Sequence, residues 1–216
     1  MNFKNPQKYS QNAKMQQLVA RDLVAFASKG IETARTILDV GCGTGFVARE
    51  ICKLFSNKIL HGLDPSKEML TMAQGHYSKL FNAKLEDFEG AKYDVILSSM
   101  SLQWVYNIEE NINKLAQSGS LYFAIPIEGN LNEIEEAFLK SNIVSPLLQT
   151  PKIGIKPEFV NEYKENFNTI LELLKSFNSI GAKNLNAKPL THNQIKSIEQ
   201  NFNGEITWKI GFFALN

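Results

Sequence analysis

Three glycines stand at alternate positions, 41, 43 and 45, in the segment LeuAspValGlyCysGlyThrGly. The segment follows the short apolar run 36–40, which predicts a strand, and precedes the amphipathic run 46–55, which predicts a helix. Glycines in such a turn permit positive φ angles and close backbone approach to a ligand, while the following helix presents free N–H groups. The spacing therefore indicates a site for a polar small molecule. The alternative is a tight turn that binds nothing.

An acidic side chain, Asp64, ends the next predicted strand, 58–64, nineteen residues after Gly45. A carboxylate there can accept hydrogen bonds from both hydroxyls of a ribose, so we expect a nucleoside cofactor. A dinucleotide-binding loop has its third glycine one position later, where this chain has Phe46. The spacing therefore favours S-adenosylmethionine (SAM) over NAD. Alternatively, Asp64 caps the helix that begins near Pro65.

Two further residues of the glycine segment belong to the predicted cofactor loop. Asp39 can orient the loop or meet the ammonium group of a methionine moiety, although a structural role in the turn is equally compatible. Cys42 is expected to fill a small buried space rather than to act as a nucleophile. Cys42 and Cys52, the two cysteines of the chain, form no CxxC pair and no Cys/His cluster with zinc spacing. We therefore predict neither a disulfide nor a metal.

Strands and helices alternate in the first part of the chain. We predict strands at 36–40, 58–64, 82–85, 93–99 and 121–126, and helices at 13–27, 46–55, 65–75 and 108–116. This order implies a Rossmann-like α/β fold with a mostly parallel central sheet and helices on both faces. We expect one domain over 1–216, with a leading helical segment at about 1–30. A partly helical insertion at about 128–168 is expected beside the ligand site, and a last strand at 205–215.

The composition sets limits on partners and location. Of 216 residues, 44% are hydrophobic, which suffices for a single substantial core. The 23 Lys and Arg nearly balance the 22 Asp and Glu, so we expect neither nucleic acid nor membrane as a partner. The first residues are polar and lack the apolar core of a signal peptide. We predict a cytoplasmic monomer.

The glycine segment, Asp64 and the strand at 93–99 together resemble the motifs of class I SAM-dependent methyltransferases. Segments 9–16, 98–105 and 173–184 are similar to the malonyl-acyl-carrier-protein O-methyltransferase family, whose members act at the start of biotin synthesis. The resemblance implies SAM as methyl donor and S-adenosylhomocysteine as product. It also implies that the acceptor is the free carboxylate of a malonyl thioester, carried on acyl carrier protein or on coenzyme A.

The resemblance also implies roles for individual residues. Tyr9, Gln103 and Trp104 are candidates for closing over the methyl group and shaping the acceptor pocket. Trp104 is equally compatible with a core position, whereas a buried amide such as Gln103 requires hydrogen-bond partners. Lys175 stands where the family often has an arginine, so it is the candidate anchor for the acceptor carboxylate. Its alternative is a solvated helix lysine.

The residues expected to contact adenine differ from the family pattern. Where the family commonly has an aspartate, this chain reads LysLeuGluAsp at 84–87. Leu85 and Glu86 are therefore the candidates for the adenine end of the cofactor, with Asp87 as the alternative to Glu86. Ser98, at the end of the strand at 93–99, completes the predicted cofactor set.

Methyl transfer to a carboxylate needs no general base, because the acceptor is already ionised at neutral pH. Alignment of the reacting atoms should dominate catalysis and can supply roughly 7–11 kcal/mol. Three alternatives stay open: a methyltransferase for another small acceptor such as a quinone precursor or a free acid, a SAM-binding protein without catalysis, and a nicotinamide-dependent oxidoreductase. Phe46 and the lack of an evident acid–base pair disfavour the last of these.

Overall fold

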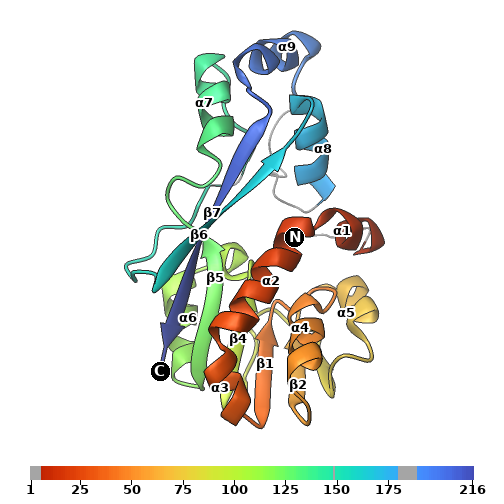
Figure 1. Cartoon of the computed structure of the whole chain (residues 1–216), viewed down its shortest axis with the longest axis vertical. Helices are drawn as coiled ribbons and strands as arrows, with labels where there is room; N and C mark the ends of the chain where they lie inside the picture. Colours follow the sequence, from red (N-terminus) through yellow and green to blue (C-terminus); the bar gives the residue numbers. More distant parts are fainter. Residues whose placement is uncertain (1–5, 148, 180–188) are drawn as a thin grey trace.

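The computed structural model describes residues 6–147, 149–179 and 189–216. Within these ranges, seven strands form one sheet in the order β3-β2-β1-β4-β5-β7-β6 (Figure 1). Their bounds are β1 Thr36–Val40, β2 Ile59–Leu63, β3 Lys79–Phe81, β4 Val95–Ser99, β5 Ser120–Pro126, β6 Phe159–Asn166 and β7 Glu205–Leu215. Strands β1 to β5 are parallel, and β7 pairs antiparallel with both β5 and β6. The predicted α/β fold with a mostly parallel sheet is confirmed.

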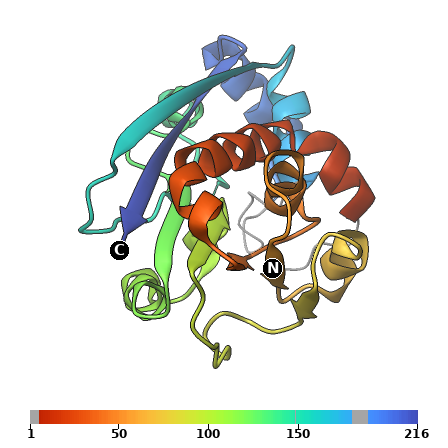
Figure 2. The same cartoon turned by 60° about the horizontal axis from the view of Figure 1, so that its bottom comes forward.

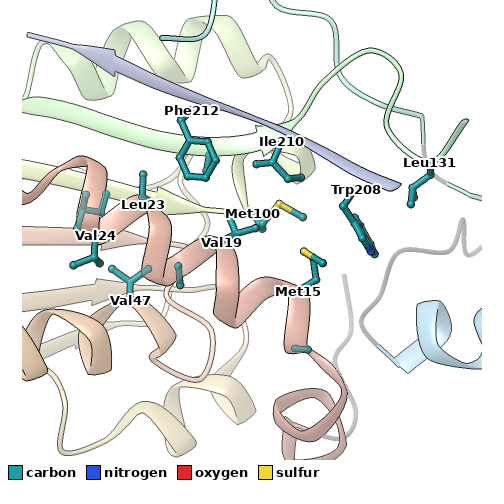
Figure 3. Close-up of a cluster of buried hydrophobic side chains, with 14 of the residues drawn as sticks. Met15, Val19, Leu23, Val24, Val47, Met100, Leu131, Trp208, Ile210 and Phe212 are labelled. Atoms are coloured by element: carbon teal, nitrogen blue, oxygen red, sulfur yellow. The ribbon is translucent and has the colours of Figure 1, made fainter. Parts of the chain in front are cut away.

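Helices cover both faces of this sheet. Their bounds are α1 Pro6–Asn12, α2 Lys14–Phe26, α3 Ser28–Thr33, α4 Phe46–Leu54, α5 Lys67–Ala73, α6 Ile108–Ala116, α7 Asn132–Lys140, α8 Ile170–Ser179 and α9 His192–Asn201, with a 3₁₀ turn η1 at Leu102–Trp104. Successive side chains of β4 point to opposite faces. Val95 and Leu97 pack with α2 and α4 in one core cluster, whereas Ile96 packs with α6 in the other. Figure 3 shows the first cluster, in which Val19, Leu23 and Val47 gather beneath Phe212 of β7.

Beyond the parallel strands, β6 and β7 continue into a second group of elements formed with α7, α8 and α9 (Figures 1 and 2). Helix α1 lies between the two groups, where it contacts α8 on one side and α5 on the other. Ser10 of α1 also donates a hydrogen bond to the Thr44 hydroxyl over 3.0 Å. The leading segment is therefore fixed next to the glycine loop. Among helices of the described residues, none has the length and apolar character needed to span a bilayer.

Several predicted boundaries differ from the structure. The helix predicted at 13–27 is α2, but the leading helical segment expected at about 1–30 continues to Thr33, because Gly30 lies inside α3. A Cβ at Gly30 would come within 2.8 Å of the Tyr122 hydroxyl, so glycine serves close packing there. The strand predicted at 82–85 lies earlier, at Lys79–Phe81. The stretch 128–168 contains α7, as expected, but also the strand β6, which was not predicted.

Candidate active site

A cavity of about 640 Å³ opens at the carboxyl ends of β1, β2 and β4, where ligands bind in open α/β sheets. The glycine-side wall consists of its lining residues between 40 and 86: Val40, Gly41, Gly43, Leu63, Asp64, Pro65, Ser66, Met69, Ala83, Lys84, Leu85 and Glu86. The C-terminal wall consists of Pro126, Asn130, Leu131, Leu147, Gln149, Thr150, Pro151, Phe177 and Trp208. Between the walls lie Tyr9, Gln16 and lining residues of the segment that follows β4. The cavity thus joins the two groups of elements.

The glycine loop has the backbone geometry that its sequence predicts. Gly41, Gly43 and Gly45 all have positive φ angles, of 69°, 53° and 86°. A Cβ at Gly41 would lie 2.2 Å from the Cβ of Ser101, so this position excludes every other residue type. At Gly43 the nearest atom to an added Cβ is the Gly41 carbonyl oxygen, 3.9 Å away. Gly43 therefore leaves open space beside the backbone in a residue that lines the cavity.

Asp64 follows the carboxyl end of β2 and is hydrogen-bonded to the glycine loop. Its Oδ2 accepts the Gly43 N–H over 2.9 Å and its Oδ1 accepts the Ser66 N–H over 2.8 Å. Burial raises the pKa of this carboxyl, and the two backbone donors oppose the shift. A carboxylate offers about four acceptor sites, so each oxygen can still accept a ligand hydroxyl. The cap of α5 is Ser66, whose side chain accepts the Met69 N–H, rather than Asp64.

Asp39 and Cys42 lie behind the loop, outside the cavity lining. Asp39 is 2% exposed, and its Oδ2 accepts a hydrogen bond of 2.6 Å from the Tyr77 hydroxyl. Its Oδ1 is buried and has no partner within the part of the chain that the structure describes. Burial raises the pKa of Asp39 to about 7, although the Tyr77 hydrogen bond lowers it and Asp64 adds to the rise. The sulfur of Cys42 would lie 2.8 Å from a Cβ added at Gly62, so it fills a small buried space, as predicted.

Ser98 also supports the loop from behind. Its hydroxyl lies 2.6 Å from that of Ser101, which in turn donates to the Val40 carbonyl over 2.8 Å. Ser98 is fully buried and does not line the cavity. The two serines tie the end of β4 to the end of β1 directly below Gly41. Of the predicted cofactor set, the structure brings Gly41, Gly43, Asp64, Leu85 and Glu86 to the cavity, and places Asp39, Cys42, Gly45 and Ser98 in its support.

The three predicted acceptor-pocket residues on α1 and η1 all line the cavity. Tyr9 stacks beside Phe46 with ring centroids 6.2 Å apart, and burial raises its pKa. Gln103 donates through Nε2 to the Met100 carbonyl over 2.8 Å, and its Oε1 is buried without a partner in the described residues. Trp104 is 36% exposed, so the core alternative for this residue is wrong.

Two other predicted residues do not reach the cavity. Lys175 is exposed on α8, and the buried residues of that helix on either side, Leu173 and Phe177, lie on the opposite face. The structure therefore does not place Lys175 as an anchor. Asp87 is likewise exposed and outside the lining, whereas Glu86 lines the cavity and accepts the Tyr106 N–H over 3.1 Å. Part of the similar segment at 173–184, residues 180–184, lies outside the described residues.

The sequence analysis missed two residues with functional geometry, Gln16 and Tyr77. Gln16 stands on the buried stripe of α2 with Val19, Ala20 and Leu23, and a glutamine on such a stripe is a signal that could have been followed. Tyr77 follows α5 and reaches the end of β1, a contact that the sequence does not display.

The charges of the cavity are unevenly distributed. Within the described part of the chain, the charged lining residues are Asp64, Lys84 and Glu86, all on the glycine-side wall. The C-terminal wall is neutral and largely apolar. No group of three or more His, Cys, Asp or Glu in the described ranges is placed to hold a metal ion. The arrangement suits a polar cofactor on one side and an uncharged chain on the other.

Known proteins match this chain in sequence. Residues 37–118, from β1 to just past α6, match the family description of a methyltransferase domain. The malonyl-[acyl-carrier protein] O-methyltransferase of Bacillus cereus is 29% identical over 207 residues, covering 82% of this chain and 77% of the relative. The second enzyme of that name in Ilyobacter polytropus is 26% identical over 225 residues, covering 92% and 86%.

The chain is a SAM-dependent methyltransferase with the class I methyltransferase fold.

The fold of this methyltransferase is shared with solved structures of low sequence identity. The YcgJ protein of Bacillus subtilis superposes with a TM-score of 0.57 at 12% identity, covering 89% of this chain and 96% of that protein. The plantazolicin methyltransferase BpumL, solved with S-adenosylhomocysteine, gives a TM-score of 0.52 at 17% identity over 97% and 90% of the two chains. These similarities concern the fold alone.

The residues of the methyltransferase fit a SAM molecule. The open space beside Gly43 permits close approach of a ligand, and Asp64 keeps acceptor capacity for ribose hydroxyls. Ser99 and Gln103 each line the cavity with a buried oxygen that has no hydrogen-bond partner in the described residues. Buried polar atoms are normally satisfied, so these oxygens indicate a polar ligand.

Proposed function

We propose that this methyltransferase methylates the free carboxylate of a malonyl thioester, carried on acyl carrier protein or on coenzyme A, as a step of biotin synthesis. The similarity of most of the chain to enzymes named for this reaction carries the proposal. It covers 92% of this chain for the Ilyobacter polytropus enzyme, well beyond the methyltransferase-domain match, which ends at residue 118. We also propose that the whole chain, 1–216, works as one domain.

The proposed cofactor assignment follows the geometry of the glycine-side wall. Gly41 and Gly43 would hold the methionine end, Asp64 the ribose hydroxyls, and Leu85 with Glu86 the adenine. SAM supplies a methyl group that is already activated as a sulfonium. Asp39, Cys42, Gly45 and Ser98 would keep the loop in position without touching the ligand.

The acceptor would enter beside Tyr9, Gln103 and Trp104. A carboxylate that leaves water requires compensating donors, and the hydroxyl and amide groups of this segment can provide them without a cation. The role of these residues is therefore to orient the acceptor and exclude water, since no proton has to be removed. The volume of about 640 Å³ lies within the range of small-ligand sites.

Mass spectrometry of malonyl-acyl carrier protein after incubation with the purified enzyme and SAM tests this function. We expect a gain of one methyl group on the carrier-bound acceptor, with malonyl-coenzyme A and free malonate as parallel acceptors. No gain on any malonyl compound, with SAM binding intact by calorimetry, would assign the enzyme to another small acceptor.

A further inference from the structure

Gln16 is a polar residue in an apolar setting. It lies on α2 among the core residues Met15, Val19 and Ala20, and it is only 9% exposed. Its side chain lines the cavity, yet its Oε1 is buried without a hydrogen-bond partner in the described residues. A leucine or methionine would occupy the same place without this unsatisfied atom. The amide therefore costs stability unless a ligand completes its hydrogen bonds.

The surroundings of Gln16 indicate the chemistry of a ligand that would complete these hydrogen bonds. Met15, the preceding residue, lies across from Trp208 of the C-terminal wall in the core cluster of Figure 3. The apolar members of that wall include Leu131, Leu147 and Phe177. The indole N–H of Trp208 donates to Glu165 over 3.1 Å, so Trp208 has no free donor for a ligand.

Among the described lining residues, the polar groups on this side of the cavity are all uncharged. Asn130, Gln149 and Thr150 are the polar members of the C-terminal wall, and the charged lining residues lie on the glycine-side wall. A cationic amine here would find no counter-charge among the described lining residues. An uncharged chain with carbonyl and amide groups would match both the apolar surface and the amide.

We propose that Gln16 binds the acceptor, by hydrogen-bonding a carbonyl or amide group of an uncharged thioester chain whose methylene groups pack on Leu131, Leu147 and Trp208. The inference rests on the proposed function, because it describes how the carrier-linked part of the malonyl thioester is held. A half-turn of the side-chain amide exchanges its oxygen and nitrogen, so Gln16 can serve either an acceptor or a donor of the ligand.

The test compares Gln16→Met with a matched control, Gln200→Met. Methionine keeps the length of the side chain and removes its hydrogen bonds, and Gln200 is an exposed residue of α9 outside the cavity lining. For both variants and the wild type we would measure the melting temperature, the SAM Kd by calorimetry, and KM and kcat with malonyl-acyl carrier protein.

We expect Q16M to raise the KM for the acceptor about tenfold, the equivalent of one typical hydrogen bond, with SAM Kd unchanged and melting temperature unchanged or higher. Q200M should match the wild type in all four quantities. An unchanged KM in Q16M would overturn the inference, as would parallel losses of melting temperature and SAM affinity, which indicate a structural residue. A wild-type enzyme that binds SAM but leaves the carrier-bound acceptor unmethylated would overturn the proposed function, and the inference with it.

Discussion

The Tyr77 hydroxyl donates a hydrogen bond of 2.6 Å to Oδ2 of Asp39, and so connects the segment after α5 to the strand that leads into the glycine loop. The other oxygen of Asp39 is buried without a partner among the described residues. A carboxyl group in this position is shielded from water and is held by a single neutral donor. Its protonation is therefore coupled to folding.

Stability should depend on pH through Asp39. Burial raises its pKa from 3.8 to about 7, so the folded state binds the proton more tightly than the unfolded chain does. The free energy of unfolding should therefore fall as the pH rises from about 4 to 7, by at most about 4 kcal/mol, and stay level above that range. The Asp39→Asn variant has no ionisable group at this position, so this contribution to the pH dependence is lost. Urea unfolding at pH 5, 6, 7 and 8 should show the wild type gaining stability relative to D39N as the pH falls, and parallel pH profiles would contradict the expectation.

Tyr77→Phe should destabilise the folded protein and weaken SAM binding. The change leaves a buried carboxylate without its donor, which typically costs about 1–3 kcal/mol. Tyr163→Phe is the matched control. Tyr163 lies on β6, away from the glycine loop, and its hydroxyl donates a hydrogen bond of 2.7 Å to Asp22. Y163F should leave the SAM Kd unchanged in calorimetry. Equal SAM affinities of Y77F and Y163F would show that the Tyr77 contact does not position the loop.

Gly43→Ala should lower SAM affinity at least tenfold with little change in fold. The added methyl group meets no protein atom nearer than 3.9 Å, and the positive φ costs roughly 1–2 kcal/mol. Gly75→Ala carries the same backbone strain, at a φ of 91° with no atom within 4 Å, outside the cavity lining. The two variants should therefore melt at similar temperatures and differ in SAM Kd. If both bind SAM as the wild type does, the glycine-side wall is not the cofactor site.

Asp64→Asn should reduce SAM affinity by roughly 10- to 100-fold, because hydrogen bonds to a charged group contribute about 1.5–3 kcal/mol. Asp94→Asn is a suitable control. Asp94 also accepts backbone N–H groups, from Arg35 and Thr36 at 2.9 and 2.8 Å, but at the opposite end of the parallel strands. D94N should lower the melting temperature and leave the SAM Kd unchanged. A D64N enzyme with wild-type affinity would remove Asp64 from the ribose site.

Elements with strong local signals were predictable from the sequence. The bounds of β1, α6 and β7 agree with the predictions, because each combines apolar periodicity with clear breaks at its ends. Edge strands were harder to predict from the sequence. β6 is mostly polar and both of its faces are partly exposed, so its strand conformation depends on pairing with β7, about 40 residues later.

The candidate site likewise has residues that could be predicted from local sequence and residues that could not. The glycine loop and Asp64 are encoded locally, and the structure brings them to one cavity. Lys175 was assigned by position within a similar segment, although its place between Leu173 and Phe177 on a helix already puts it on the other face. The role proposed for Gln16 depends on the C-terminal wall, which lies more than 100 residues away in sequence and lines the same cavity.

The antiparallel pairing of β5 with β7 joins two segments that the ribosome makes at different times. Strand β5 includes the apolar residues Leu121, Phe123 and Ile125. The strand that pairs with its edge, β7, is translated about 80 residues later. Until that partner emerges from the ribosome, the nascent chain presents an open hydrophobic strand edge, a common origin of aggregation. Trp208 arrives on the same late strand. Strands β1 to β4 can therefore pair first, and the C-terminal wall is completed only when β7 covers this edge.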